Sequence, residues 1–89
     1  MGLKFGLHCK KTVYTNGVIE IRDAEVRLHC IDGPAFENKW GHKEWLRHGK
    51  LHRLEGPAIV YPNGTVYYCI NGKELTKGAW EYSCSLIKE

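Results

Sequence analysis

Residues 51–64 read Leu-His-Arg-Leu-Glu-Gly-Pro-Ala-Ile-Val-Tyr-Pro-Asn-Gly, and the first part of this stretch recurs 23 positions earlier (51 − 28) as Leu-His-Cys-Ile-Asp-Gly-Pro-Ala-Phe in residues 28–36. A fixed period of this length is the signature of stacked supersecondary units. The sequence therefore predicts a repeat protein. Aligning residues 29–51 with 52–74 pairs identical residues at these positions: His29/His52, Gly33/Gly56, Pro34/Pro57, Ala35/Ala58, Gly41/Gly64, Gly49/Gly72 and Lys50/Lys73.

Turn signals divide each unit into a hairpin. Asn-Gly at residues 16–17, 63–64 and 71–72 stands between runs of β-forming residues, and this dipeptide favours tight turns because both positions tolerate positive φ. In the first full unit the corresponding turns, at residues 39–41 and 47–49, keep the glycine but lose the asparagine. We therefore expect strand, turn and strand in every unit.

The two ends of the chain depart from the repeat. Alternating apolar residues predict a first strand over residues 3–9 and a further extended segment over residues 26–30. After Leu75 the apolar residues fall at helical spacing, and Thr76 is a candidate N-cap. We predict a mainly β protein: an antiparallel meander of about three stacked hairpins with a short C-terminal capping helix. Its 89 residues form one domain (1–89), with divergent strands in 1–27, repeats in 28–51 and 52–75, and the helix in 76–89.

Composition narrows the function classes. The formal net charge is +3 with acids and bases interspersed, so no basic block marks a nucleic-acid footprint, and nucleic acid is an unlikely partner. No apolar run approaches the roughly 20 residues that span a bilayer, and no secretory signal is evident. We expect a cytoplasmic protein whose four cysteines are free, buried thiols; in an oxidising compartment they would instead form two disulfides.

The repeated motif resembles a known family. Residues 51–58, the Asn63-Gly64 turn, the aromatic pair at 67–68 and Asn71-Gly72-Lys73 are similar to the MORN-like hairpin repeats of bacteriophage proteins and of a group of antitoxins. The resemblance covers roughly residues 28–88 and departs at Cys30, where the motif has arginine. It implies a β-meander, often with a short C-terminal helix, and it implies no catalytic residues.

The candidate binding residues come from two patterns. Polar side chains beside the Gly-Pro corners either hydrogen-bond to the neighbouring hairpin or line a rim that contacts a phosphate or an acidic surface. Exposed aromatic residues are typical of interaction hot spots, and strand alternation places Tyr67 on the face opposite Tyr68, with Trp40 at a turn nearby. The candidate binding set is His29, His52, Arg53, Glu55, Trp40 and Tyr67.

Enzymatic and metal chemistry are weakly indicated. There is no nucleophile elbow, phosphate-binding loop or paired-carboxylate motif, so we expect no enzyme, no catalytic residue and no cofactor. Zinc could draw on the cysteines and on His8, His29 and His52, but no Cys-x-x-Cys spacing is present, so we predict no metal site.

These patterns predict a non-enzymatic binding protein. With the resemblance, they favour a phage-type counter-defence inhibitor that sequesters a host factor in the host cytoplasm, either a host protein or a small nucleotide-like immune signal. The alternatives are a structural or assembly module that forms a homo-oligomer and an antitoxin-like interaction module.

Overall fold

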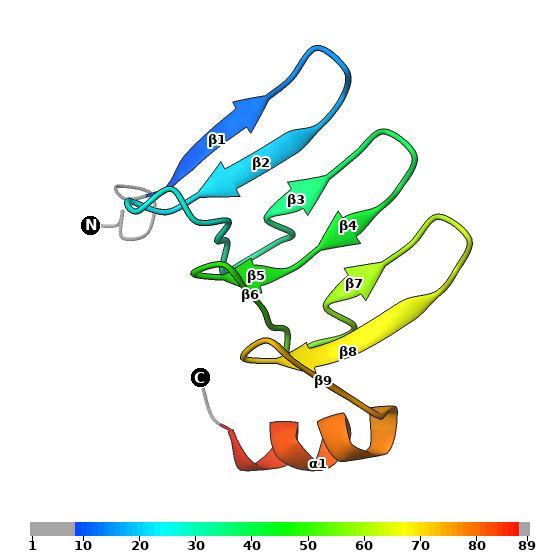
Figure 1. Ribbon diagram of the computed structural model, residues 1–89. Coiled ribbons are helices and arrows are strands. Elements are labelled where there is room, and N and C mark those ends of the chain that lie inside the picture. The colour runs from blue at the N-terminus through cyan, green and yellow to red at the C-terminus, as the bar shows by residue number, and fades with distance from the viewer. Residues whose placement is uncertain (1–8, 88–89) are drawn as a thin grey trace.

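The computed structural model describes residues 9–87, in which three antiparallel hairpins lie side by side and a helix follows the last one (Figure 1). Seven strands form one sheet in the order β1-β2-β3-β4-β7-β8-β9, and β5 and β6 form a separate two-stranded ribbon. The predicted mainly β meander with a C-terminal helix is confirmed. The predicted strand over residues 3–9 falls almost wholly outside the described residues. The elements are β1 (Lys10–Val13), β2 (Ile19–Arg22), β3 (Phe36–Glu37), β4 (Lys43–Glu44), β5 (Leu46–Arg47), β6 (Lys50–Leu51), β7 (Ile59–Val60), β8 (Val66–Ile70), β9 (Lys73–Leu75) and α1 (Lys77–Leu86).

The hydrogen bonds of the hairpin loops show that the N-terminal segment is a third unit of the same kind. The Gly17 N–H donates to the Tyr14 carbonyl at 3.0 Å, and Gly41 and Gly64 each donate to the carbonyl three residues before them. These glycines have φ between 92° and 97°, a region that disfavours any side chain. Their spacing is 24 residues (41 − 17) and then 23 (64 − 41). One extra residue between the N-terminal unit and the first full unit therefore hid the register of the N-terminal unit from the repeat alignment.

A second tight turn closes each full unit. His48 and Gly49 have φ of 49° and 81°, and Asn71 and Gly72 have φ of 52° and 84°. Positive φ at both central residues defines the type I′ turn, which suits the twist of a hairpin. Asparagine is common at the first of these positions because its short polar side chain tolerates left-handed backbone. The first unit places a histidine there instead.

The prediction of an extended segment over residues 26–30 is wrong. Within it Leu28 makes only an isolated bridge to Arg22, and Asp23 and Arg27 close a turn in which the Asp23 N–H donates to the Arg27 carbonyl at 2.8 Å. Val26 has φ of 67° in this turn, which is strained for a β-branched residue. The alternation of apolar residues did not indicate a strand here, because Val26 is 68% exposed and contributes nothing to a buried face.

The helix α1 is fixed at its start and by one aromatic ring. The Thr76 side chain accepts a hydrogen bond from the Ala79 N–H at 3.1 Å, as an N-cap does. Trp80 packs on Tyr68 of β8 with ring centroids 4.7 Å apart, and its indole N–H donates to the Arg53 carbonyl at 2.8 Å. The helix has no fully buried residue. Its attachment therefore depends largely on Trp80.

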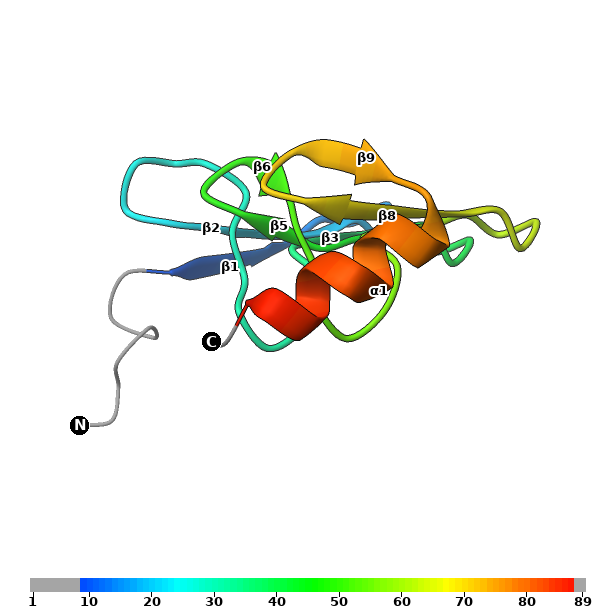
Figure 2. The same ribbon diagram turned by 90° about the horizontal axis from the view of Figure 1, so that it is seen from below.

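The sheet has one face that carries the helix and one that does not. Tyr68 contacts Trp80 of α1, and side chains alternate between faces along a strand, so Tyr67 points to the other side. Figure 2 shows α1 on one side of the sheet and the turns around β6 and β9 curling toward the other. We call the side that carries Tyr67 the open face.

The core is small, and its centre is the alanine of each Gly-Pro-Ala corner. Ala35 and Ala58 are fully buried, and their N–H groups donate to the carbonyls of Glu44 and Tyr67 at 2.8 Å. A larger side chain would not fit between the hairpins, which explains why both units carry alanine. No cysteine forms a disulfide within residues 9–87, and of the four only Cys69 is buried, so the prediction of buried thiols is wrong for the other three. Among residues 9–87 no helix is long and apolar enough to cross a membrane.

Candidate functional site

The two repeated histidines lie inside their units. His29 and His52 are only 6% and 5% exposed. The Nδ1 atom of His29 accepts a hydrogen bond from the His48 N–H at 2.8 Å, and Nδ1 of His52 accepts one from the Asn71 N–H at 3.1 Å. Each imidazole at the start of a unit thus holds the type I′ turn that ends the same unit. This arrangement leaves neither ring on an exposed rim.

The guanidinium of Arg53 is also engaged within the fold. It lies 3.8 Å above the centre of the Trp45 ring, a cation–π geometry, and Nη1 donates to the Pro57 carbonyl at 3.2 Å. A Cβ atom on Gly56 would come within 3.0 Å of the same guanidinium. The first unit has Cys30 at this position, and its thiol lies 3.4 Å from the Asp32 carboxylate. Arg53 therefore stabilises the Gly-Pro corner of the second full unit through contacts that Cys30 cannot make in the first full unit.

A pocket of about 260 Å³ lies between the two Gly-Pro corners. It brings His52, Arg53 and Glu55 of the predicted set together with Asp32 and Trp45. Glu55 is exposed at its edge. Acidic and basic groups both line this corner pocket, so its charge does not select a ligand of one sign.

A second surface is formed by rings on the open face. Phe36, His42, Tyr61 and Tyr67 make successive edge-to-face contacts, with ring centroids 5.6, 4.9 and 5.9 Å apart. This geometry is the one that aromatic pairs prefer. We call these four residues the aromatic row. It joins the hairpin loops and strands of both full repeats.

The aromatic row borders a shallow groove of about 380 Å³. The residues that line it include Ile59, Tyr61, Tyr67, Cys69 and Glu74. Tyr67 is 37% exposed. Trp40, which the sequence predicts near Tyr67, is 67% exposed at a loop tip, where the Lys39 ammonium lies 5.1 Å from its ring. Of the two predicted aromatic residues, only Tyr67 belongs to the row.

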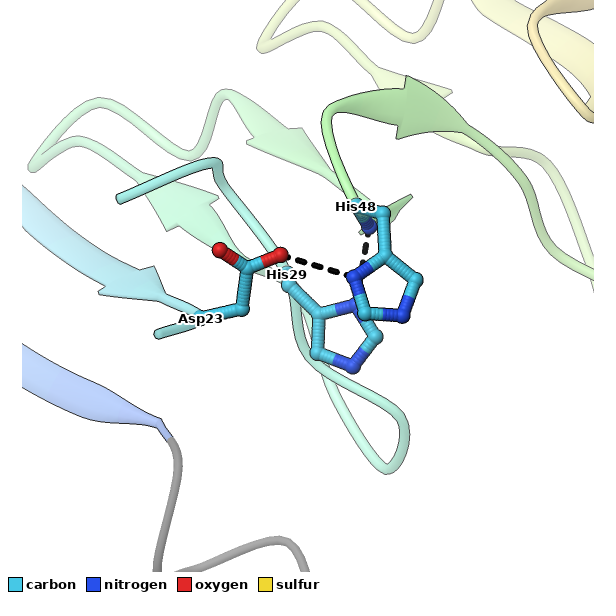
Figure 3. Close-up of side chains that lie close together, drawn as sticks. All are labelled: Asp23, His29 and His48. Atoms are coloured by element: carbon cyan, nitrogen blue, oxygen red, sulfur yellow. Dashed lines mark hydrogen bonds and ion pairs between the residues drawn. The ribbon is translucent and has the colours of Figure 1, made fainter. Parts of the chain in front are cut away.

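The third constellation lies where the N-terminal unit meets the first full repeat. Asp23, His29 and His48 come together here, and we call them the joint cluster (Figure 3). His48 Nδ1 lies 2.7 Å from Asp23 Oδ2, and the His29 and His48 rings stack with centroids 4.0 Å apart. One donor atom from each of the three residues lies within 4.8 Å of the others.

The charges in the joint cluster are set by burial and hydrogen bonding. Burial raises the pKa of the Asp23 carboxyl, but hydrogen bonds from His48 and from the N–H groups of Arg27 and Glu25 outweigh it, so the pKa lies well below its usual value. Burial lowers the pKa of His29, and the nearby His48 lowers it further. His29 is therefore neutral at pH 7, as an Nδ1 acceptor must be.

Sequence reasoning missed Asp23 and His48 as partners of His29, and Phe36, His42 and Tyr61 as partners of Tyr67. The repeat alignment held one signal, since His48 stands where the second unit has Asn71. Phe36, His42 and Tyr61 gave no such signal, because they lie at strand ends and in loops whose register depends on the fold.

No protein-family model, no curated protein and no solved structure matches this chain.

Proposed function

We propose that this protein is a non-enzymatic binding module that sequesters a partner protein on its open face. The observation that carries the proposal is the continuous aromatic row on the face opposite α1, where Tyr67 is 37% exposed. Aromatic side chains bury large areas at little entropic cost, so they dominate binding energies at protein interfaces. The corner residues support this division of roles, because hydrogen bonds within the fold already engage His29, His52 and Arg53.

Carboxylates beside the row define the chemistry of the partner. Glu44 lies 2.8 Å from the His42 ring at the centre of the row, and Glu74 lines the groove beside Tyr67. Tyrosine rings next to carboxylates favour an arginine or lysine side chain, through cation–π attraction and charge pairing. We therefore propose a partner that inserts a basic residue flanked by apolar ones.

The resemblance to MORN-like repeats supplies the biological setting of the proposal. In that setting the chain is a counter-defence inhibitor, and its target is a protein of the bacterial host. A nucleotide-like signal is less favoured, because the corner pocket that would hold it is lined by charges of both signs.

Replacing Tyr67 is expected to weaken partner binding strongly without unfolding the protein. Threonine suits a strand, so Tyr67→Thr removes the ring while β8 is kept. The variant chain is immobilised and exposed to a bacterial lysate. It should retain about one tenth or less of the partner that the unmodified chain retains, as loss of a hot-spot tyrosine predicts. Quantitative mass spectrometry of the bound fraction measures the difference.

Tyr82→Ala is the matched control. Tyr82 is 69% exposed on α1 and makes no ring contact that the structure records among residues 9–87. Its loss should leave both capture and the melting temperature unchanged. Equal capture by the Tyr67→Thr and Tyr82→Ala chains would contradict a binding role for the open face.

Assembly with a second copy is the alternative that one observation favours. The strand β1 is an outer strand of the sheet and pairs only with β2 among the described residues, and such an edge can accept another strand. Light scattering separates the two functions. A mass that rises with concentration favours assembly, whereas a constant monomer mass favours the partner.

A further inference from the structure

We propose that the joint cluster of Asp23, His29 and His48 binds a divalent transition-metal ion, with zinc as the best match. A carboxylate oxygen and two imidazole nitrogens are the ligand types that zinc takes in proteins. One such atom from each residue already lies within 4.8 Å of the other two, so modest side-chain rotations bring all three onto one ion. The three ligands come from the end of β2, the segment after it and the β5–β6 turn.

The carboxylate is oriented in advance. Asp23 Oδ1 accepts the N–H groups of Glu25 and Arg27 at 2.9 and 3.0 Å, which leaves Oδ2 facing the His48 ring. Hydrogen bonds to the atom of a ligand group that does not face the metal fix the orientation of that group and commonly raise metal affinity. The side chain of His48 is 57% exposed, so an ion can enter from solvent. Three protein ligands leave the ion an open position for water or for a group of a partner.

The neighbouring Arg27 opposes the ion. Its guanidinium lies 3.1 Å from Asp23 Oδ2 and 3.3 Å from His48 Nδ1, where it takes part of the place a cation would occupy. The side chain is 44% exposed and also pairs with Glu25 at 3.2 Å, so it can turn outward when an ion arrives. Arg27 should therefore weaken the site without closing it, and its removal should strengthen binding.

The second repeat shows which substitution of His48 makes a suitable control. Asn71 holds the position of His48 with nearly the same backbone, φ of 52° against 49°, and its N–H meets the His52 ring as the His48 N–H meets His29. His48→Asn thus introduces a residue that this turn already accommodates. It removes an imidazole ligand and keeps the backbone hydrogen bond.

The test is calorimetric titration of the chelator-stripped full chain with Zn²⁺, with the metal-free melting temperature of each variant measured alongside. The original chain should bind a single ion at the cluster. His48→Asn should weaken that binding at least about tenfold, as loss of a ligand or its support does, and Arg27→Ala should strengthen it. His42→Asn removes a histidine that pairs with Glu44 outside the cluster, and it should change nothing in the titration.

Two results would overturn the proposal. One is the absence of a zinc-binding isotherm for the original chain. The other is binding of equal strength in the folded His48→Asn chain, which would show that the ion binds elsewhere on the chain. Failure of this site leaves the aromatic row and its partner untouched, because the two sites share no residue.

Discussion

Replacing His52 by alanine is expected to lower the free energy of unfolding by about 3 kcal/mol, a large part of the margin of so small a domain. The imidazole is 5% exposed, so its loss leaves a cavity between the hairpins. The Asn71 N–H also loses the acceptor that it meets at 3.1 Å, and the type I′ turn after β8 loses its anchor. Chemical denaturation followed by circular dichroism measures the change.

His52→Asn is the control for this prediction. The asparagine oxygen, like Nδ1 of histidine, is bonded to Cγ, so it can accept the same N–H. About half of the lost stability should return, and the remaining loss should reflect the smaller volume of the side chain. If alanine and asparagine destabilise equally, volume alone explains the effect and the hydrogen bond has no special part.

Replacing Trp80 by alanine is expected to cost about 2 to 3 kcal/mol and to release α1 from the sheet. The ring packs on Tyr68 with centroids 4.7 Å apart, and its N–H satisfies the Arg53 carbonyl. A helix of ten residues is marginal in water on its own, so it should melt once this contact is lost. The far-ultraviolet helical signal and the unfolding midpoint should fall together.

Trp80→Phe separates the two contributions of the indole. Phenylalanine keeps a ring against Tyr68 but cannot donate to the Arg53 carbonyl, so the loss should be about 1 kcal/mol, the usual worth of one hydrogen bond. A helical signal that persists unchanged in Trp80→Ala would show that other contacts hold α1.

The sequence predicted the parts of the fold that local chemistry dictates. Asn-Gly at residues 16–17, 63–64 and 71–72 marks observed turns, and Thr76 is the observed N-cap. In the first full unit the glycines alone did not predict how the loop is held. There the Asn38 side chain accepts hydrogen bonds from the N–H groups of Trp40 and His42, and the repeat alignment gave no sign of this role.

The candidate sites were only partly predictable, because they depend on contacts between units. Tyr67 follows from strand alternation, whereas its ring neighbour Tyr61 belongs to a loop whose direction only the folded hairpin sets. Asp23 lies 25 residues from His48, and the extra residue between the N-terminal unit and the first full unit obscures their relation. Repeated residues were also ambiguous in principle, since a motif required for stacking looks the same as one required for binding.

The contacts favour different residues for folding and for the proposed partner binding. His29, His52, Arg53 and Trp80 make hydrogen bonds inside the described structure, and we propose that Tyr67 and its row take the partner. Changes at the corners should therefore lower stability, and changes on the open face should lower binding.

The most direct test of this division is the protonation state of the buried imidazoles, measured by side-chain ¹⁵N NMR as the pH is lowered from neutrality. The structure predicts that neutral His29 and neutral His52 carry their proton on Nε2, since Nδ1 of each ring accepts a backbone N–H. Because burial holds the pKa of His29 below its usual value, that ring should stay neutral at a pH where an exposed histidine is charged, below about 6.5. A neutral ring of either histidine with its proton on Nδ1 would contradict the account and return the corner histidines to the candidates for partner binding.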